Sequence, residues 1–73
     1  MERMDLKLFG QRIRDLRTER GVSAMVVGKA VGISDTTIIH WENADNMPKL
    51  DMAVLMAKYF GVSMDYLCGL KDF

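Results

Sequence analysis

The apolar positions of the chain recur at helical spacing and predict five helices. One apolar stripe follows the segment over about 5–20: Leu6, Phe9, Ile13 and Leu16. Further helices are expected over about 24–31, 35–43 and 50–60, with a short one starting after Ser63 and ending near Gly69. The helix over 50–60 is apolar nearly all round, so we expect it to lie inside the domain.

The same three-residue punctuation separates these helices at three places: Gly21–Val22–Ser23, Gly32–Ile33–Ser34 and Gly61–Val62–Ser63. The glycine can adopt a positive φ and end one helix, and the serine hydroxyl can cap the next. An apolar residue stands four positions after each serine: Val27, Ile38 and Leu67. The agreement of these local signals predicts an all-α fold, a compact five-helix bundle.

The helix over 35–43 has two unlike faces. Ile38 and Trp41 share one face, which should pack in the core. The other face is polar and short, and it carries Thr36, Ile39, His40 and Asn43. Before it, Gly28 stands inside a helix at a cost of about 1 kcal/mol relative to alanine, which suggests a close approach between helices.

Two helices joined by a three-residue turn that contains glycine make a helix-turn-helix, here over about 23–43. The run V-G-K-A-V-G-I-S-D-T-T-I-I-H-W-E-N resembles the Cro and lambda-repressor-like DNA-binding domains, as do R-D-L-R before it and G-V-S-M-D-Y-L-C-G-L after it. The resemblance covers roughly residues 8–70. It implies a lambda-repressor-like five-helix bundle whose second motif helix enters the major groove of double-stranded DNA.

The resemblance also implies a DNA-binding set: Ser23, Ala24, Ser34, Asp35, Thr36, Thr37, Ile39, His40, Asn43 and Lys49. Asp35, Thr36 and His40 match base-contacting positions, and backbone N–H groups at the helix starts, with Asn43 and Lys49, would meet phosphates. Simpler interpretations stay open, because Asp35 can serve only the helix dipole, His40 can be merely solvated, and an exposed Ile39 needs no explanation.

Two further implications concern structure. Arg17 and Glu42 match an internal ion pair that ties the first helix to the third, although both charges could simply be solvated. Family relatives pair through the region around their last helix, which implies a homodimer here through Tyr66, Leu67, Leu70 and Phe73.

The chain departs from the family pattern at several positions. Ala24 replaces the usual Gln, Gly28 the usual Ala, and Ala44 the usual Gly, while 45–47 is Asp-Asn-Met where basic residues are common. These changes remove groups that would meet phosphates, so we expect modest DNA affinity.

Composition sets the limits of these expectations. The 73 residues suffice for one small domain, expected over 1–73, and 49% of them are apolar. The 10 basic and 10 acidic residues give zero net charge, which counts against nucleic-acid binding because such domains are usually basic. The single cysteine, Cys68, cannot form an intramolecular disulfide, and we expect a cytoplasmic protein without a membrane segment.

Two functions follow from these observations. The first is a dimeric, sequence-specific DNA-binding transcriptional regulator, most often a repressor in this family. The alternative is a helix-turn-helix module that binds a protein partner, as an antitoxin-like or anti-repressor element. We expect no enzyme, cofactor or small-molecule substrate, because the sequence has no phosphate loop and no plausible nucleophile–base pair. No metal site is expected either, since His40, the only histidine, has no second ligand at a suitable spacing.

Overall fold

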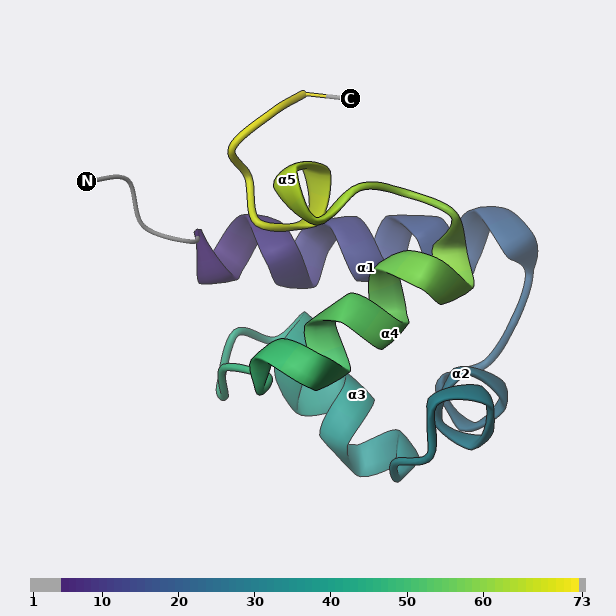
Figure 1. Cartoon of the computed structure of the whole chain (residues 1–73). Coiled ribbons are helices and arrows are strands. Elements are labelled where there is room, and N and C mark those ends of the chain that lie inside the picture. Colours follow the sequence, from purple (N-terminus) through teal and green to yellow (C-terminus); the bar gives the residue numbers. More distant parts are fainter. Residues whose placement is uncertain (1–4, 73) are drawn as a thin grey trace.

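The computed structural model describes residues 5–72, which fold into five helices without a strand in that range (Figure 1). The bounds are α1 Leu6–Arg20, α2 Ala24–Val31, α3 Asp35–Glu42, α4 Leu50–Phe60 and α5 Met64–Leu67. The all-α prediction is confirmed. Helix α3 ends one residue earlier than expected, because Asn43 is its C-cap, and α5 stops at Leu67 with Cys68 as its C-cap.

The helix boundaries are fixed by the predicted punctuation. The hydroxyls of Ser23, Ser34 and Ser63 accept hydrogen bonds from backbone N–H groups three residues later, at 3.2, 3.2 and 3.0 Å. The three preceding glycines close α1, α2 and α4 with φ values of 65°, 84° and 69°. Each of these capping interactions satisfies helix-end groups that would otherwise lack partners. The chain also caps α1 with Asp5, whose carboxylate accepts from Leu8 N–H at 3.1 Å.

The core forms where the apolar stripes of the helices meet. The largest fully buried side chains are Phe9, Ile13, Val27, Ile38, Met56 and Leu67. Trp41 is buried among them, as predicted, and meets Phe9 edge to face with 6.4 Å between ring centroids. All three apolar residues that follow the capping serines therefore lie in the core.

Helix α4 is less buried than its composition suggested. Its inner face, made of Ala53, Met56, Ala57 and Phe60, is in the core. Leu50 and Leu55 lie outside it and are 75% and 39% exposed. The expectation of a fully internal helix is therefore wrong, because a five-helix domain of this size covers only one face of α4.

Two glycines let backbones meet closely. A Cβ on Gly28 would lie 2.5 Å from the carbonyl oxygen of Ile33. The close approach predicted for Gly28 is therefore present, but its partner is the turn before α3 and not the body of a helix. Gly10 serves the same purpose on α1, where a Cβ would collide with the carbonyl oxygens of Trp41 and Glu42 at the end of α3.

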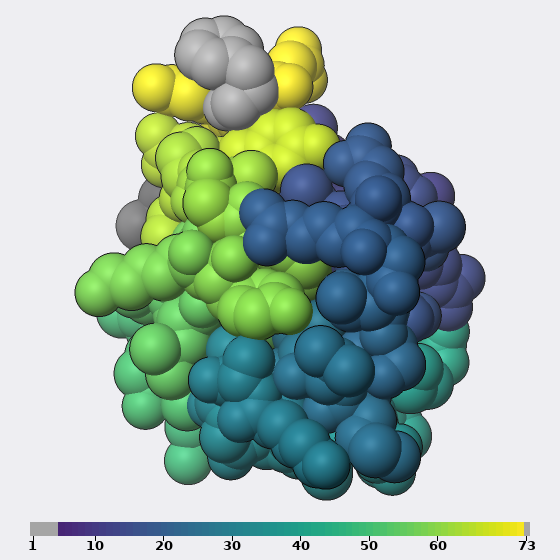
Figure 2. Space-filling model, turned by 90° about the vertical axis from the view of Figure 1, so that its right-hand side faces the viewer, coloured from purple at the N-terminus to yellow at the C-terminus, as the bar shows by residue number. Residues whose placement is uncertain are grey.

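Helices α2 and α3 lie together on one side of α1, and α5 lies on the other side (Figure 1). Figure 2 shows the same separation from the side, with the C-terminal segment at one end of the molecule and the turn between α2 and α3 at the other. The helix-turn-helix is thus presented at an end of the domain that the C-terminal segment leaves open.

Candidate nucleic-acid interface

Helix α3 is held by its inner face and open on its outer face. Ile38, Trp41 and Glu42 are buried, while Thr36 and Ile39 are exposed and His40 is half-buried. The division of residues between the two faces is the one predicted from helical spacing. A helix anchored in this way can offer its polar side to a groove without rearranging the core.

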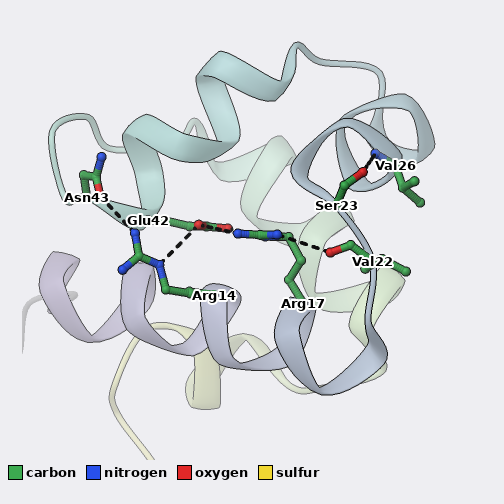
Figure 3. Close-up of polar contacts among 7 residues, drawn as sticks. All are labelled: Arg14, Arg17, Val22, Ser23, Val26, Glu42 and Asn43. Carbon is green, nitrogen blue, oxygen red and sulfur yellow. Dashed lines mark hydrogen bonds and ion pairs between the residues drawn. The ribbon is translucent and has the colours of Figure 1, made fainter.

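The predicted ion pair is present and is built around a buried carboxylate (Figure 3). Arg17 donates from Nε to Glu42 Oε2 at 2.7 Å and from Nη2 to Oε1 at 3.0 Å, so the pair is bidentate. The Glu42 side chain is 1% exposed. The hydrogen bond to Glu42 raises the pKa of Arg17 despite partial burial. The guanidinium therefore stays charged at every pH at which the protein is folded. Arg17 also donates to the carbonyl oxygen of Val22, which connects the turn between α1 and α2 to the same network.

Arg14 joins this network, and the sequence interpretation assigned it no role in the site. Its Nε lies 3.4 Å from Glu42 Oε1, and its Nη2 donates to Asn43 Oδ1 at 3.1 Å (Figure 3). The available signal was the spacing of three residues between Arg14 and Arg17, which places both on one face of α1. Two guanidinium groups therefore share one carboxylate beside the end of α3.

The polar groups at the start of α3 are mostly engaged with one another. Ser34 Oγ caps the helix and also lies 2.9 Å from Thr37 Oγ1. Asp35 Oδ1 accepts from Thr36 N–H at 2.8 Å, in keeping with the helix-end role for this acid. Ser34, Asp35 and Thr36 are exposed, and Thr37 is half-buried.

The remaining predicted DNA-binding residues lie around this helix. Ser23 is exposed and Ala24 is half-buried at the start of α2, and Lys49 is exposed at the N-cap of α4. Lys49 and Thr37 line the same groove, between α3 and the loop that follows it. His40 Nδ1 lies 3.3 Å from Asp45 Oδ2, a pairing with the loop that the sequence did not indicate.

The loop after α3 begins with a strained residue. Ala44 N–H bonds to Trp41 O and Asp45 N–H bonds to His40 O, the paired bonds of a Schellman motif. Ala44 occupies the left-handed position with φ of 59°, the only non-glycine residue with positive φ in the range 5–72. The family's usual glycine at this position thus has a physical reason, and this chain meets the same geometry at a conformational cost.

The positive charges of α1 are largely used inside the domain. Arg12 donates to the carbonyl oxygens of Tyr66 and Lys71, and Arg20 donates to those of Tyr59 and Phe60. Arg14 and Arg17 hold Glu42. The basic residues counted in the sequence are therefore less available to a ligand than their number suggests.

Only some of the residues expected at a dimer contact are exposed. Leu67 is fully buried in the core of the protomer itself, so its expected place at an interface is corrected. Tyr66 is half-buried, and the guanidinium of Arg12 lies 4.1 Å from its ring centroid. Leu70 is 45% exposed, and Phe73 lies outside the described residues.

A cap-and-turn geometry of this kind, with a buried inner face on the second helix, defines a helix-turn-helix domain. The profile of a helix-turn-helix family matches residues 13–67, and the chain belongs to this family. Among curated relatives, it is 34% identical over 55 residues to the transcriptional repressor RstR of cryptic phage CTXphi of Vibrio cholerae, covering 75% of this chain and 50% of RstR. It is 33% identical over 64 residues to repressor protein C2 of Salmonella phage P22, covering 88% of this chain and 30% of that protein.

Solved structures agree with this assignment. The P22 c2 repressor in complex with a synthetic operator superimposes with a TM-score of 0.79 at 33% identity, over 82% of this chain and 91% of that one. The restriction-modification controller protein C.AhdI from Aeromonas hydrophila gives a TM-score of 0.79 at 27% identity, over 86% and 96% of the two chains. The lambda-repressor-like bundle is therefore confirmed as the fold. The chain spans about half of RstR and less than a third of the P22 repressor.

Proposed function

We propose that the protein is a sequence-specific DNA-binding transcriptional regulator, acting as a repressor, that places α3 in the major groove of double-stranded DNA. The observation that carries this proposal is the two-sided character of α3. Ile38, Trp41 and Glu42 fix its inner face, while Thr36, Ile39 and His40 face outward one turn apart or less. Side chains so placed can reach the edges of neighbouring base pairs.

The relatives support the same function. RstR and the P22 protein are named repressors, and the P22 structure contains an operator. A regulator of this kind acts in the cytoplasm by binding alone, with no enzyme activity, cofactor or small-molecule substrate. No helix within residues 5–72 is long and apolar enough to cross a membrane.

The test begins by selecting a preferred duplex from a random-sequence library, followed by competition with a scrambled duplex. Thr36→Ala and His40→Ala should each weaken binding to the preferred duplex by about 1–3 kcal/mol and leave thermal stability almost unchanged. Their binding to scrambled DNA should fall much less. Lys49→Ala is the matched control, because a phosphate contact should weaken binding to all sequences alike and lower the salt slope.

Two results would oppose the proposal. If no duplex is selected at all, DNA is not the ligand. If the Thr36 and His40 variants keep the wild-type preference, α3 is not the element that contacts bases. For the wild type we expect a shallow slope of log K against log salt concentration, because few basic side chains near α3 in the described part of the chain are available to phosphates. A slope near −10 would contradict this.

A protein-binding module remains the second candidate, because one observation favours it. Met47 and Leu50 are 65% and 75% exposed beside the groove that Lys49 lines. Exposed apolar side chains in one region suit a protein partner better than a phosphate backbone. The selection experiment separates the two candidates, since this module would yield no preferred duplex.

We also propose that the protein works as a homodimer, because one short helix contacts only a few base pairs. With Leu67 in the core, the contact would rest on Tyr66 and Leu70, while Phe73, also expected to take part, lies outside the described residues. Leu70→Asp should then shift sedimentation toward the monomer and weaken binding to a two-half-site duplex. A wild-type monomer both free and on DNA would refute this.

A further inference from the structure

Two polar side chains from different helices, Arg14 and Asn43, meet at the end of α3. Arg14 reaches across from α1 and donates to the Oδ1 atom of Asn43, the C-cap of α3. A guanidinium has only donors, so the amide atom that faces it must be the oxygen. The Nδ2 group of Asn43 therefore points away from Arg14 (Figure 3), and Asn43 is an exposed residue.

Arg14 retains donors and charge after making these contacts. Its Nε faces Glu42 and one Nη2 hydrogen faces Asn43, which leaves the Nη1 group and the second Nη2 hydrogen. The side chain is 50% exposed, unlike that of Arg17, which is 21% exposed. Because Glu42 is a single carboxylate between two guanidinium groups, the cluster keeps a net charge of +1, and that charge is exposed through Arg14.

We propose that Arg14 and Asn43 form a binding site for one phosphate of the DNA backbone. In this site Arg14 supplies charge and N–H donors, and it also holds the Asn43 amide with its NH₂ group facing the phosphate. The inference rests on the proposed DNA-binding function and adds a contact residue, Arg14, on a helix outside the helix-turn-helix.

The chemistry of this location favours such a site. The C-terminal end of a helix carries partial negative charge and would by itself repel a phosphate. A guanidinium at that end offsets the repulsion and can bind a phosphate oxygen through two donors. The loop residues Ala44, Asp45, Asn46 and Met47 carry no cation, and of the two guanidinium groups that bind Glu42 at the end of α3, that of Arg14 is the more exposed.

The experiment measures binding of wild type, Arg14→Met, Asn43→Ala and the double variant to the selected duplex and to its scrambled form, over a range of salt concentrations. Lys58→Met is the control, because it removes the same charge from the last turn of α4. Thermal unfolding of each variant is recorded, and titrations are run well below each midpoint, since Arg14 also contacts Glu42.

We expect Arg14→Met to weaken binding to both duplexes alike by about tenfold and to reduce the salt slope by about 0.9, the loss of one phosphate contact. Asn43→Ala should weaken both duplexes too, and the double variant should bind about as well as Arg14→Met, because the amide contact depends on Arg14. Lys58→Met should change neither quantity appreciably.

The proposal is overturned if Arg14→Met binds like Lys58→Met, if it weakens only the selected duplex, or if the two single losses multiply in the double variant. These outcomes all require a wild type that binds DNA. A wild type that binds no duplex instead refutes the proposed function itself, so the two failures are distinguishable.

Discussion

Removing either member of the Arg17–Glu42 pair should lower the free energy of unfolding by a large share of its total. Arg17→Ala leaves the Glu42 carboxylate, 1% exposed, with only Arg14 Nε at 3.4 Å as its charged partner. An uncompensated buried charge typically costs about 3–5 kcal/mol, and the remaining Arg14 contact places this variant near about 3. A domain of this size has a total stability near the low end of about 5–15 kcal/mol. At about 4–8 °C per kcal/mol, the unfolding midpoint should fall by about 12 °C or more.

The loss for Glu42→Ala should be somewhat smaller, about 2 kcal/mol, because the two released guanidinium groups can turn toward water. The double variant should cost less than the sum of the two single ones, since each single variant already removes the pair. Urea unfolding followed by Trp41 fluorescence measures all three, because the indole is buried and becomes solvated on unfolding. Glu19→Ala, an exposed charge on the same helix, is the control and should stay within about 0.5 kcal/mol. Two small, additive losses would show that the pair contributes nothing beyond solvated charges.

Three other substitutions or reactions test the structure. Ala44→Gly should stabilise the domain by about 0.5–1 kcal/mol in urea unfolding, because it relieves a left-handed alanine while adding some chain entropy to the unfolded state; destabilisation would argue against the Schellman turn. Gly28→Ala should destabilise by about 2 kcal/mol in spite of its better helix propensity, because the new methyl meets the Ile33 carbonyl oxygen at 2.5 Å. Burial, followed by the charge of Asp65, raises the pKa of Cys68, so less thiolate is present at pH 8 than in a free cysteine. Its alkylation by iodoacetamide should therefore be slow in the native protein and fast in urea, and equal rates would refute this.

The fold could be predicted because its signals are local. A glycine, a β-branched residue and a serine in sequence mark a helix end and a helix start whatever surrounds them, and all three such marks lie where expected. The face of α3 that is buried also follows from spacing alone. Burial of α4 did not follow, because the exposure of Leu50 depends on how many helices the domain has to cover it.

The site was harder to predict, because its geometry depends on contacts between distant residues. Arg14 lies 29 positions before Asn43, and nothing in the local sequence marks them as neighbours. The positive charge available to a ligand could not be predicted for a related reason, since a count of basic residues does not distinguish Arg12, bound to backbone carbonyls, from an exposed lysine. Leu67 was assigned to a dimer surface because family relatives pair around their last helix, whereas packing within the domain buries its side chain.

The way α1 holds the C-terminal segment has a consequence for building larger proteins from this domain. Asp5 N–H bonds to Cys68 O at 3.1 Å and Arg12 binds Lys71 O at 2.8 Å, so α1 and its N-cap hold the segment that follows α5 on the α5 side of α1. Helix α3 faces the opposite side (Figure 1). A fluorophore, an affinity tag or a whole additional domain joined at either end would therefore extend away from a DNA duplex lying along α3.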